Sequence, residues 1–163
     1  MHDIKCIIFD LDRCSFNTPV YSTGDVPGFD YTYGDMHHVA SLTQEKILVT
    51  AGDTEVQQQK IARVGIAHHF AEVHIDTIGD KESIFKSIMS RRMLQPHRIM
   101  VVGDNPNAEL GAGKHLGMVT VQTLRPTVVR WAEADFHVTS FAELDSIISA
   151  FDAMSRRRGC TPL

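Results

Sequence analysis

The sequence predicts an α/β fold in which a mostly parallel sheet carries helices on both faces. Two observations lead to this class. Short apolar runs alternate with longer helical patterns along the chain, and the 163 residues, 43% of them hydrophobic, contain no internal repeat or low-complexity stretch. Parallel strands need long crossover connections, usually helices, which accounts for the alternation. We therefore expect a single domain over residues 1–163.

The elements follow one another in a regular order. The apolar runs predict strands over residues 4–9, 46–50, 71–75, 99–103 and 118–123, with a short sixth strand near 136–139. Helical spacing of apolar residues predicts helices over 53–64, 81–92, 106–116 and 141–154. In the last of these, Phe141, Leu144, Ile147, Ile148 and Phe151 form one apolar stripe.

Composition and charge exclude several classes of partner. Sixteen basic and twenty acidic residues give a net charge of -4, which offers no overall attraction to nucleic acid or to an anionic membrane. The three cysteines have neither zinc-site spacing nor a secreted-type disulfide pattern. No stretch approaches the roughly 20 apolar residues that span a bilayer, and the start of the chain lacks a leader pattern. We expect a cytoplasmic protein with no nucleic-acid or membrane partner.

Polar residues follow the predicted strands at the ends where ligands of parallel sheets bind. The first strand ends at Asp10 and Asp12, the second at Thr50 and Ala51, the fourth at Asp104 and Asn105, and Lys81 begins the helix after the third. These residues are expected to share one edge of the sheet.

Asp10 and Asp12 are the most informative pair. Alternate residues of a strand face the same side, and two buried carboxylates are costly unless a cation or hydrogen-bond donors accompany them. Magnesium, which prefers oxygen ligands, is the expected cation. Structural alternatives exist at each position: the two acids could cap a turn, Thr50 could be a turn hydroxyl, and Asp104 could cap a helix.

The ordered set of motifs resembles the haloacid dehalogenase-like superfamily of hydrolases, chiefly its magnesium-dependent phosphatases. The resemblance is carried by Phe9-Asp10-Leu11-Asp12, by Leu48-Val49-Thr50-Ala51-Gly52, by Lys81, and by the run from Val101 to Glu109. It covers nearly the whole chain after residue 3, apart from 13–44 and the last few residues. It implies a Rossmann-like three-layer sandwich with a minimal or absent cap domain.

The resemblance also implies a phosphomonoester hydrolase that acts through a phosphoaspartate. Asp10 would be the nucleophile. Asp12 would protonate the leaving oxygen and later deprotonate water. Thr50, Ala51 and Lys81 would bind the phosphoryl oxygens.

The expected cofactor is Mg²⁺. By the resemblance it would be held by Asp10, Asp104 and the backbone carbonyl of Asp12. Asn105 and Glu109 would support these ligands from outside the set that contacts the metal, Glu109 through a water or through a neighbouring ligand. A purely structural role of Glu109 in its helix is the alternative.

Three positions depart from the usual family pattern. Arg13 and Cys14 stand where the family usually has glycine and threonine, and Glu109 stands where it usually has aspartate. Arg13 could alter the turn and reduce activity, because glycine permits unusual backbone conformations. Alternatively, its planar guanidinium could bind a second anionic group of the substrate, or it could simply face solvent.

Segment 13–44 is too short for a large cap domain, yet it contains Phe16, Phe29 and all three tyrosines of the chain. We expect a short flap or lid over the site, with packing on the domain or on another subunit as the alternative. A site without a cap could admit a large substrate or use a neighbouring subunit as its lid, so a homo-oligomer is a further hypothesis. The expected ligand is a phosphorylated small molecule.

Two other classes compete with the enzyme. A phosphoacceptor receiver domain also places acids, threonine, lysine and magnesium around a parallel sheet, but its phosphorylated aspartate follows the third strand. A catalytically weak binding or regulatory protein with the same fold is the other alternative, motivated by Arg13 and Cys14.

Overall fold

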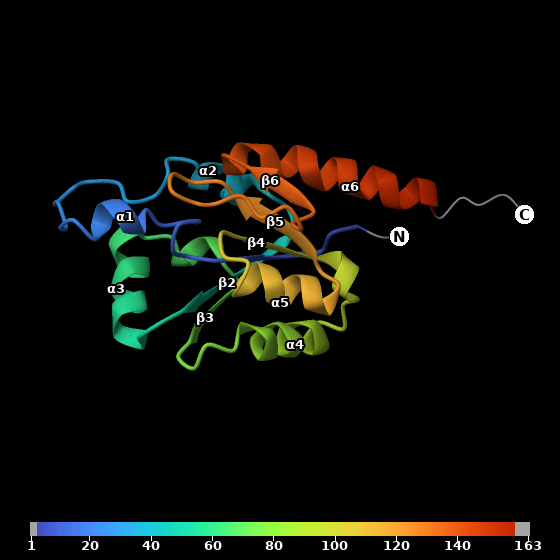
Figure 1. The fold of residues 1–163 in the computed structure, drawn as a ribbon, viewed down its shortest axis with the longest axis horizontal. Helices are drawn as coiled ribbons and strands as arrows, with labels where there is room; N and C mark the ends of the chain where they lie inside the picture. The colour runs from blue at the N-terminus through green and yellow to red at the C-terminus, as the bar shows by residue number, and fades with distance from the viewer. Residues whose placement is uncertain (1–2, 159–163) are drawn as a thin grey trace, which may run out of the picture.

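The computed structural model describes residues 3–158, in which six parallel strands form one sheet in the order β3-β2-β1-β4-β5-β6 (Figure 1). The strands are β1 (Cys6–Phe9), β2 (Glu45–Ala51), β3 (Glu72–Asp76), β4 (Ile99–Gly103), β5 (Val119–Thr123) and β6 (Phe136–Val138). The predicted strands are confirmed with small shifts of their ends. The order changes direction between β1 and β4, which is where ligands of open α/β sheets bind.

The helices form two layers, as predicted for a three-layer sandwich. They are α1 (Thr18–Tyr21), α2 (Met36–Ser41), α3 (Thr54–Val64), α4 (Lys81–Arg91), α5 (Glu109–Leu116) and α6 (Leu144–Arg158). Helices α4 and α5 cover one face of the sheet and α6 lies on the other, near α2 (Figure 1). None of the helices within residues 3–158 is long and apolar enough to cross a membrane.

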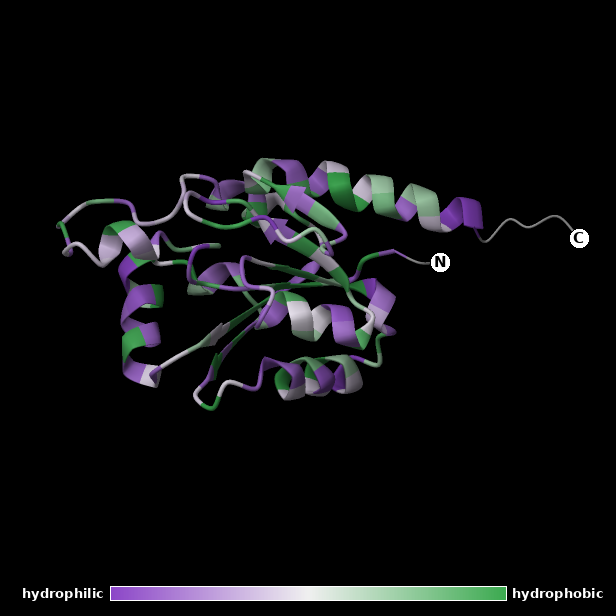
Figure 2. Ribbon diagram, viewed as in Figure 1, coloured by the Kyte–Doolittle hydropathy of each residue, from purple (hydrophilic) through white to green (hydrophobic). Residues whose placement is uncertain are grey.

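The central strand β1 is buried on both faces. Ile7 and Phe9 join a core with residues of α2, α3 and α6, whereas Cys6 and Ile8 pack with Phe85 of α4 on the opposite face. Figure 2 shows the apolar strands between helices whose outer faces are hydrophilic. Burial on both faces explains why this strand reads as a nearly continuous apolar run.

The turn after β4 differs from the prediction, because α5 begins at Glu109 rather than near residue 106. The side chain of Asn105 accepts a hydrogen bond from the backbone N–H of Asn107 at 2.9 Å, and its carbonyl accepts one from Ala108. This local turn competes with the first helical turn. The alternative in which Asp104 caps this helix is therefore wrong, since Ala108 precedes the helix.

Segment 13–44 contains two short helices and an aromatic cluster of its own. Phe16 and Tyr31 are fully buried, and Tyr21 packs edge-on against Tyr31 with ring centroids 5.1 Å apart. The Tyr31 hydroxyl accepts a hydrogen bond from Val26 and donates one to Gly24, at 2.6 and 3.1 Å. Tyr31 is therefore a packing residue of the segment rather than part of its outer surface.

A buried ion pair fastens the same segment to the far side of the sheet. Arg125, just after β5, makes two hydrogen bonds to the carboxylate of Asp35 at 2.7 and 3.1 Å. It also donates to the carbonyl of Cys14, and its guanidinium lies 4.2 Å from the ring centre of Tyr33. We call this the Arg125–Asp35 pair. No sequence pattern indicated it.

Candidate active site

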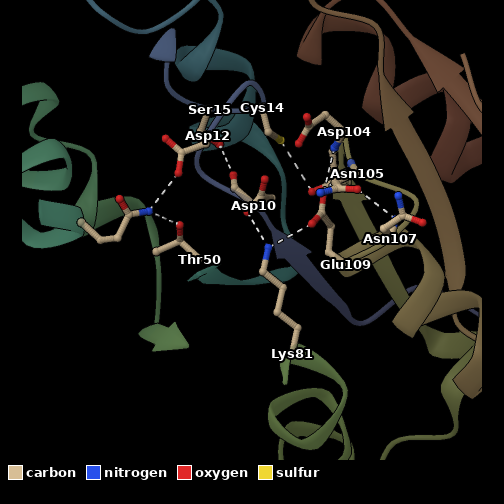
Figure 3. A network of polar contacts seen from close by, with 12 residues as sticks. Asp10, Asp12, Cys14, Ser15, Thr50, Lys81, Asp104, Asn105, Asn107 and Glu109 are labelled. Carbon is tan, nitrogen blue, oxygen red and sulfur yellow. Dashed lines mark hydrogen bonds and ion pairs between the residues drawn. The ribbon is translucent and has the colours of Figure 1, made fainter. Parts of the chain in front are cut away.

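The predicted site residues surround one small cavity at the carboxyl end of the sheet. This cavity of about 160 Å³ is lined by Asp10, Asp12, Arg13, Ala51, Lys81, Asp104, Asn105, Ala108 and Glu109. Of the residues predicted for the site, only Thr50 lies outside this lining, and its side chain is buried. Three strands and two helices thus deliver the polar groups to one place, as Figure 3 shows.

Lys81, the first residue of α4, places its ammonium group between two carboxylates (Figure 3). Its Nζ donates to Asp10 Oδ1 at 2.7 Å and to Glu109 Oε2 at 2.9 Å. The start of α4 is fixed because the Asp80 side chain accepts a hydrogen bond from Ser83 N–H. Burial opposes the charge on Lys81, but the two carboxylates raise its pKa. Lys81 is therefore a cation within the site.

Glu109 links Lys81 to the turn after β4. Its Oε1 accepts hydrogen bonds from the backbone N–H groups of Asp104 and Asn105, both at 2.8 Å. The side chain lies directly on Gly103, where an added Cβ would fall 2.2 Å from Oε1. Glycine at position 103 therefore leaves the room that Glu109 needs. Glu109 therefore supports the turn by direct hydrogen bonds.

The buried charges of the site do not balance. Carboxylate oxygens of Asp10, Asp104 and Glu109 all lie within 4.8 Å of one another, with Lys81 as the cation that contacts two of them. Burial and the charge of Glu109 raise the pKa of Asp10 well above its usual range. The same two causes raise the pKa of Asp104 to about 6. The cluster carries excess negative charge, which is costly in a buried site.

A magnesium ion fits this donor set. Mg²⁺ takes oxygen ligands and is commonly bound by one or two carboxylates together with substrate phosphate. Asp10 and Asp104 can supply those carboxylates. Both oxygens of Glu109 already accept hydrogen bonds from protein groups, so Glu109 is better suited to orient than to bind.

Asp12 faces away from this cluster and is held by three donors. Its carboxylate accepts hydrogen bonds from Thr18 Oγ1 at 2.6 Å, Lys60 Nζ at 2.8 Å and Gln57 Nε2 at 2.9 Å. Burial alone would raise the pKa of Asp12, but these hydrogen bonds together lower it. Gln57 also donates to Thr50 Oγ1 at 2.6 Å, so Thr50 and Asp12 share one partner.

Arg13 adopts a backbone conformation that glycine adopts more readily. Its φ is +55°, in the left-handed region that favours glycine, and its N–H donates to the carbonyl of Phe16. Cys14 is buried, and burial followed by the charge of Asp10 raises its pKa well above the usual thiol range. Its thiol is suited to packing rather than to nucleophilic attack.

The comparisons with known proteins identify the family of the chain. A family model described as haloacid dehalogenase-like hydrolase matches residues 25–117, more than half of the chain. The chain belongs to this family. The matched range contains Thr50, Lys81, Asp104 and Glu109, while Asp10 and Asp12 precede it. No curated protein matches the chain significantly in sequence.

Solved structures show the same fold over nearly the whole hydrolase. A haloacid dehalogenase-like hydrolase from Xanthomonas campestris superposes with a TM-score of 0.76 at 15% identity, covering 95% of this chain and 99% of that one. A magnesium-bound hydrolase of the family from Bacillus subtilis gives 0.71 at 10% identity, covering 90% and 99%. A family phosphatase from Thermococcus onnurineus gives 0.62 at 22% identity, covering 72% and 58%. Dehalogenases are also among the matched structures.

Several polar residues of this hydrolase were missed by the sequence analysis. Gln57 and Lys60 reach Asp12 from one face of α3, and they are three residues apart in the sequence. Their helical spacing after the Thr50 turn was the available signal. Ser15 donates to the carbonyl of Asp10 at 2.9 Å, and Gln122 donates to the carbonyl of Asp104 at 3.1 Å. The contact between Gln122 and Asp104 depends on tertiary packing.

Proposed function

We propose that this hydrolase is a magnesium-dependent phosphomonoesterase that forms a phosphoaspartate on Asp10. The charge imbalance carries the proposal: Asp10, Asp104 and Glu109 are clustered around one lysine. A phosphoryl group would add further negative charge to the same place. A cation held by Asp10 and Asp104 would neutralise the phosphoryl oxygens. Without that cation, Lys81 would be the cation that faces both the carboxylates and the phosphoryl oxygens.

In the first half of the reaction, a carboxylate oxygen of Asp10 attacks phosphorus, and the bond from phosphorus to the leaving oxygen breaks. The leaving oxygen takes a proton from Asp12. In the second half, the oxygen of a water attacks phosphorus while Asp12 accepts the proton of that water. The bond between phosphorus and the Asp10 oxygen breaks, which releases phosphate and restores the carboxylate of Asp10. Lys81 contacts Asp10 directly and is placed to bind the phosphoryl oxygens that reach it.

The contacts of Asp12 fit the second half better than the first. Its lowered pKa and its ion pair with Lys60 favour the ionised form, which is the form that accepts a proton. For the first half, Asp12 must carry a proton and turn from Lys60 toward the leaving oxygen. We therefore infer that substrate binding weakens the contact between Asp12 and Lys60.

The alternative reaction, displacement of a halide by Asp10, uses these residues less fully. A halide leaves as an anion and needs no proton, so Asp12 would have no part in its departure. The clustered acids would also repel the departing halide. A phosphomonoester needs both a proton for its leaving oxygen and a cation beside its phosphoryl group, and the site supplies residues for both.

The test is a direct comparison of the two activities in purified protein. We expect hydrolysis of p-nitrophenyl phosphate to be about 100-fold faster with Mg²⁺ than after removal of divalent cations by a chelator. We expect no chloride release from chloroacetate. Chloride release without phosphatase activity would overturn the proposal, as would phosphatase activity that is unchanged by the chelator.

A further inference from the structure

A second cavity adjoins the proposed catalytic site and is formed largely by the loop between β5 and β6. It has a volume of about 580 Å³, and its lining includes Arg13, Arg130, Trp131, Asp104 and Asn105. Arg13, Asp104 and Asn105 also line the cavity of the candidate active site, so the two cavities share one wall. We call it the arginine pocket. The leaving group of a phosphoryl group bound at Asp10 could reach this pocket across that shared wall.

One buried glutamine holds this loop beside the site. Gln122 of β5 is fully buried, and its Nε2 donates to the carbonyls of Asp104 and Val129 at 3.1 and 2.9 Å. Its Oε1 accepts a hydrogen bond from the backbone N–H of Trp131 at 2.7 Å. The wall that carries Arg130 and Trp131 is thus tied to the turn that carries Asp104. A wall fixed in this way can select among ligands.

The arginine pocket favours an anion. Within residues 3–158, neither Arg13 nor Arg130 has a carboxylate oxygen within 4.0 Å, so both guanidinium groups can bind a ligand. Asp104 is the one acid of the lining, and the proposed function assigns it to the cation. Guanidinium groups bind carboxylate and phosphate groups through paired hydrogen bonds.

The opposite side of the catalytic site has the reverse character. A cavity of about 420 Å³ there is lined by Asp76, Asp80 and Glu82 as well as Lys81. Asp76 is buried, and its Oδ2 has no hydrogen-bond partner among the described residues. An anionic leaving group would be repelled on that side. An anionic leaving group should therefore point toward the arginine pocket and away from the acidic cavity.

We propose, on the basis of the proposed phosphatase function, that the natural substrate is a phosphomonoester whose leaving group carries a second negative charge, bound by Arg13 and Arg130 in the arginine pocket. Trp131 adds a flat apolar surface to the same pocket. A planar or apolar portion between the two anionic groups would therefore be bound there as well.

Three matched esters test the assignment: phenyl phosphate, 4-carboxyphenyl phosphate and 4-(aminomethyl)phenyl phosphate. They share the phosphoryl group and ring and differ in the charge at the far end. We expect kcat/KM with Mg²⁺ to be at least about tenfold higher for the carboxylate ester than for the neutral ester. The cationic ester should be the poorest of the three.

The variants Arg130→Gln and Arg13→Gln localise the effect. Each should lower the ratio of kcat/KM for the carboxylate ester over the neutral ester by about tenfold. The change should fall mainly on KM, because the lost contact binds ground state and transition state alike. Arg157→Gln, which removes an exposed arginine from the distant end of α6, is the matched control and should leave the ratio unchanged.

The outcomes separate this inference from the proposed function. Equal rates on the three esters, preference for the cationic ester, or a ratio unaffected by Arg130→Gln would overturn the pocket assignment and leave the phosphatase proposal standing. Absence of Mg²⁺-dependent hydrolysis of every ester would overturn the phosphatase proposal. In that case, ligand binding is measured by the fluorescence of Trp131, the only tryptophan of the chain. A fluorescence change with 4-carboxyphenyl phosphate that Arg130→Gln abolishes would support anion binding in the arginine pocket. No fluorescence change would contradict it.

Discussion

Two buried ionic clusters in this hydrolase differ in charge balance: one has equal numbers of acids and cations, and the other has more acids than cations. In the Arg125–Asp35 pair, one guanidinium meets one carboxylate, and carbonyls of Cys14 and Thr139 accept its remaining hydrogen bonds. In the catalytic cluster, one lysine faces the carboxylates of Asp10 and Glu109, and the carboxylate of Asp104 adds a further negative charge. Both clusters are largely shielded from water.

This difference in charge balance distinguishes a structural ion pair from a cluster that is suited to bind a cation. The Arg125–Asp35 pair is complete within the chain, and it joins segment 13–44 to the strands on the other side of β1. The candidate active-site cluster has more carboxylates than cations within the described residues. The raised pKa of Asp104 favours proton uptake in the metal-free protein, and the proposed cation would balance the same charge. Burial of charged residues alone therefore does not identify a site, whereas burial without compensation does.

The largest expected effect comes from removing the proposed nucleophile. Asp10→Asn should lower phosphatase activity by about 10⁴-fold or more, because the amide cannot attack phosphorus. The fold should be kept, since the variant removes one charge from a cluster with too many. Steady-state kinetics and thermal unfolding measure both properties. Retention of a tenth of the wild-type rate would exclude Asp10 as the nucleophile.

Breaking the balanced cluster should have the opposite effect, on stability rather than on chemistry. Arg125→Met leaves the buried Asp35 without its cation and should lower the free energy of unfolding by about 3–5 kcal/mol. Denaturant titration measures this. Arg91→Met, which removes an exposed arginine paired with Glu72, is the matched control and should cost at most about 1 kcal/mol. Equal losses in the two variants would show that Arg125 is not a structural anchor.

The unbalanced cluster should respond to pH and Mg²⁺ together. Because burial and Glu109 raise the pKa of Asp104 to about 6, the folded protein without metal holds this proton more tightly than the unfolded chain. Its stabilising contribution is present below the unfolded pKa of 3.8 and is lost as pH rises through about 6. Mg²⁺ must displace the proton, so Mg²⁺ affinity should increase over the same range.

The variant Asp104→Asn removes this behaviour. It should raise the free energy of unfolding of the metal-free protein at neutral pH by about 1–2 kcal/mol, since repulsion with Glu109 is lost. It should also weaken Mg²⁺ binding, which calorimetry one pH unit above and below the pKa would measure. An unchanged magnesium titration would place the cation elsewhere.

The smallest expected effect concerns the ion pair of Lys60 with Asp12. Lys60→Met should raise the pKa of Asp12. Because kcat/KM reports the first half of the reaction, in which Asp12 donates a proton, the basic limb of the pH profile of kcat/KM should move to higher pH. Stability should fall by only about 1 kcal/mol, because the pair is partly exposed. Lys86→Met, which breaks the exposed pair with Glu82, is the control and should leave the profile in place. A profile that shifts equally in both variants would contradict a specific role of Lys60.

The sequence predicted the sheet and the edge at which the site lies, because each strand is an apolar run and polar residues follow it. It did not predict the partners that fix those residues. Lys60 reaches Asp12 across 48 positions, and Arg125 reaches Asp35 across 90. Such contacts follow from the folded arrangement of elements and carry no local periodicity. The turn at Asn105 was missed because one side chain redirected the backbone.

Within segment 13–44, the chain leaves the domain after Asn17 and returns at Tyr31. The two ends of this excursion meet where the backbone N–H of Asn17 donates to the carbonyl of Tyr31 at 2.7 Å. The intervening residues 22–30 are exposed, while Phe16 and Tyr31 on either side of them are buried. Insertions are tolerated where the chain leaves and re-enters a domain at neighbouring points and makes few buried contacts between them. This excursion is thus a candidate acceptor for a grafted domain near residue 28, and we expect a fusion there to leave the sheet and the candidate active site unchanged.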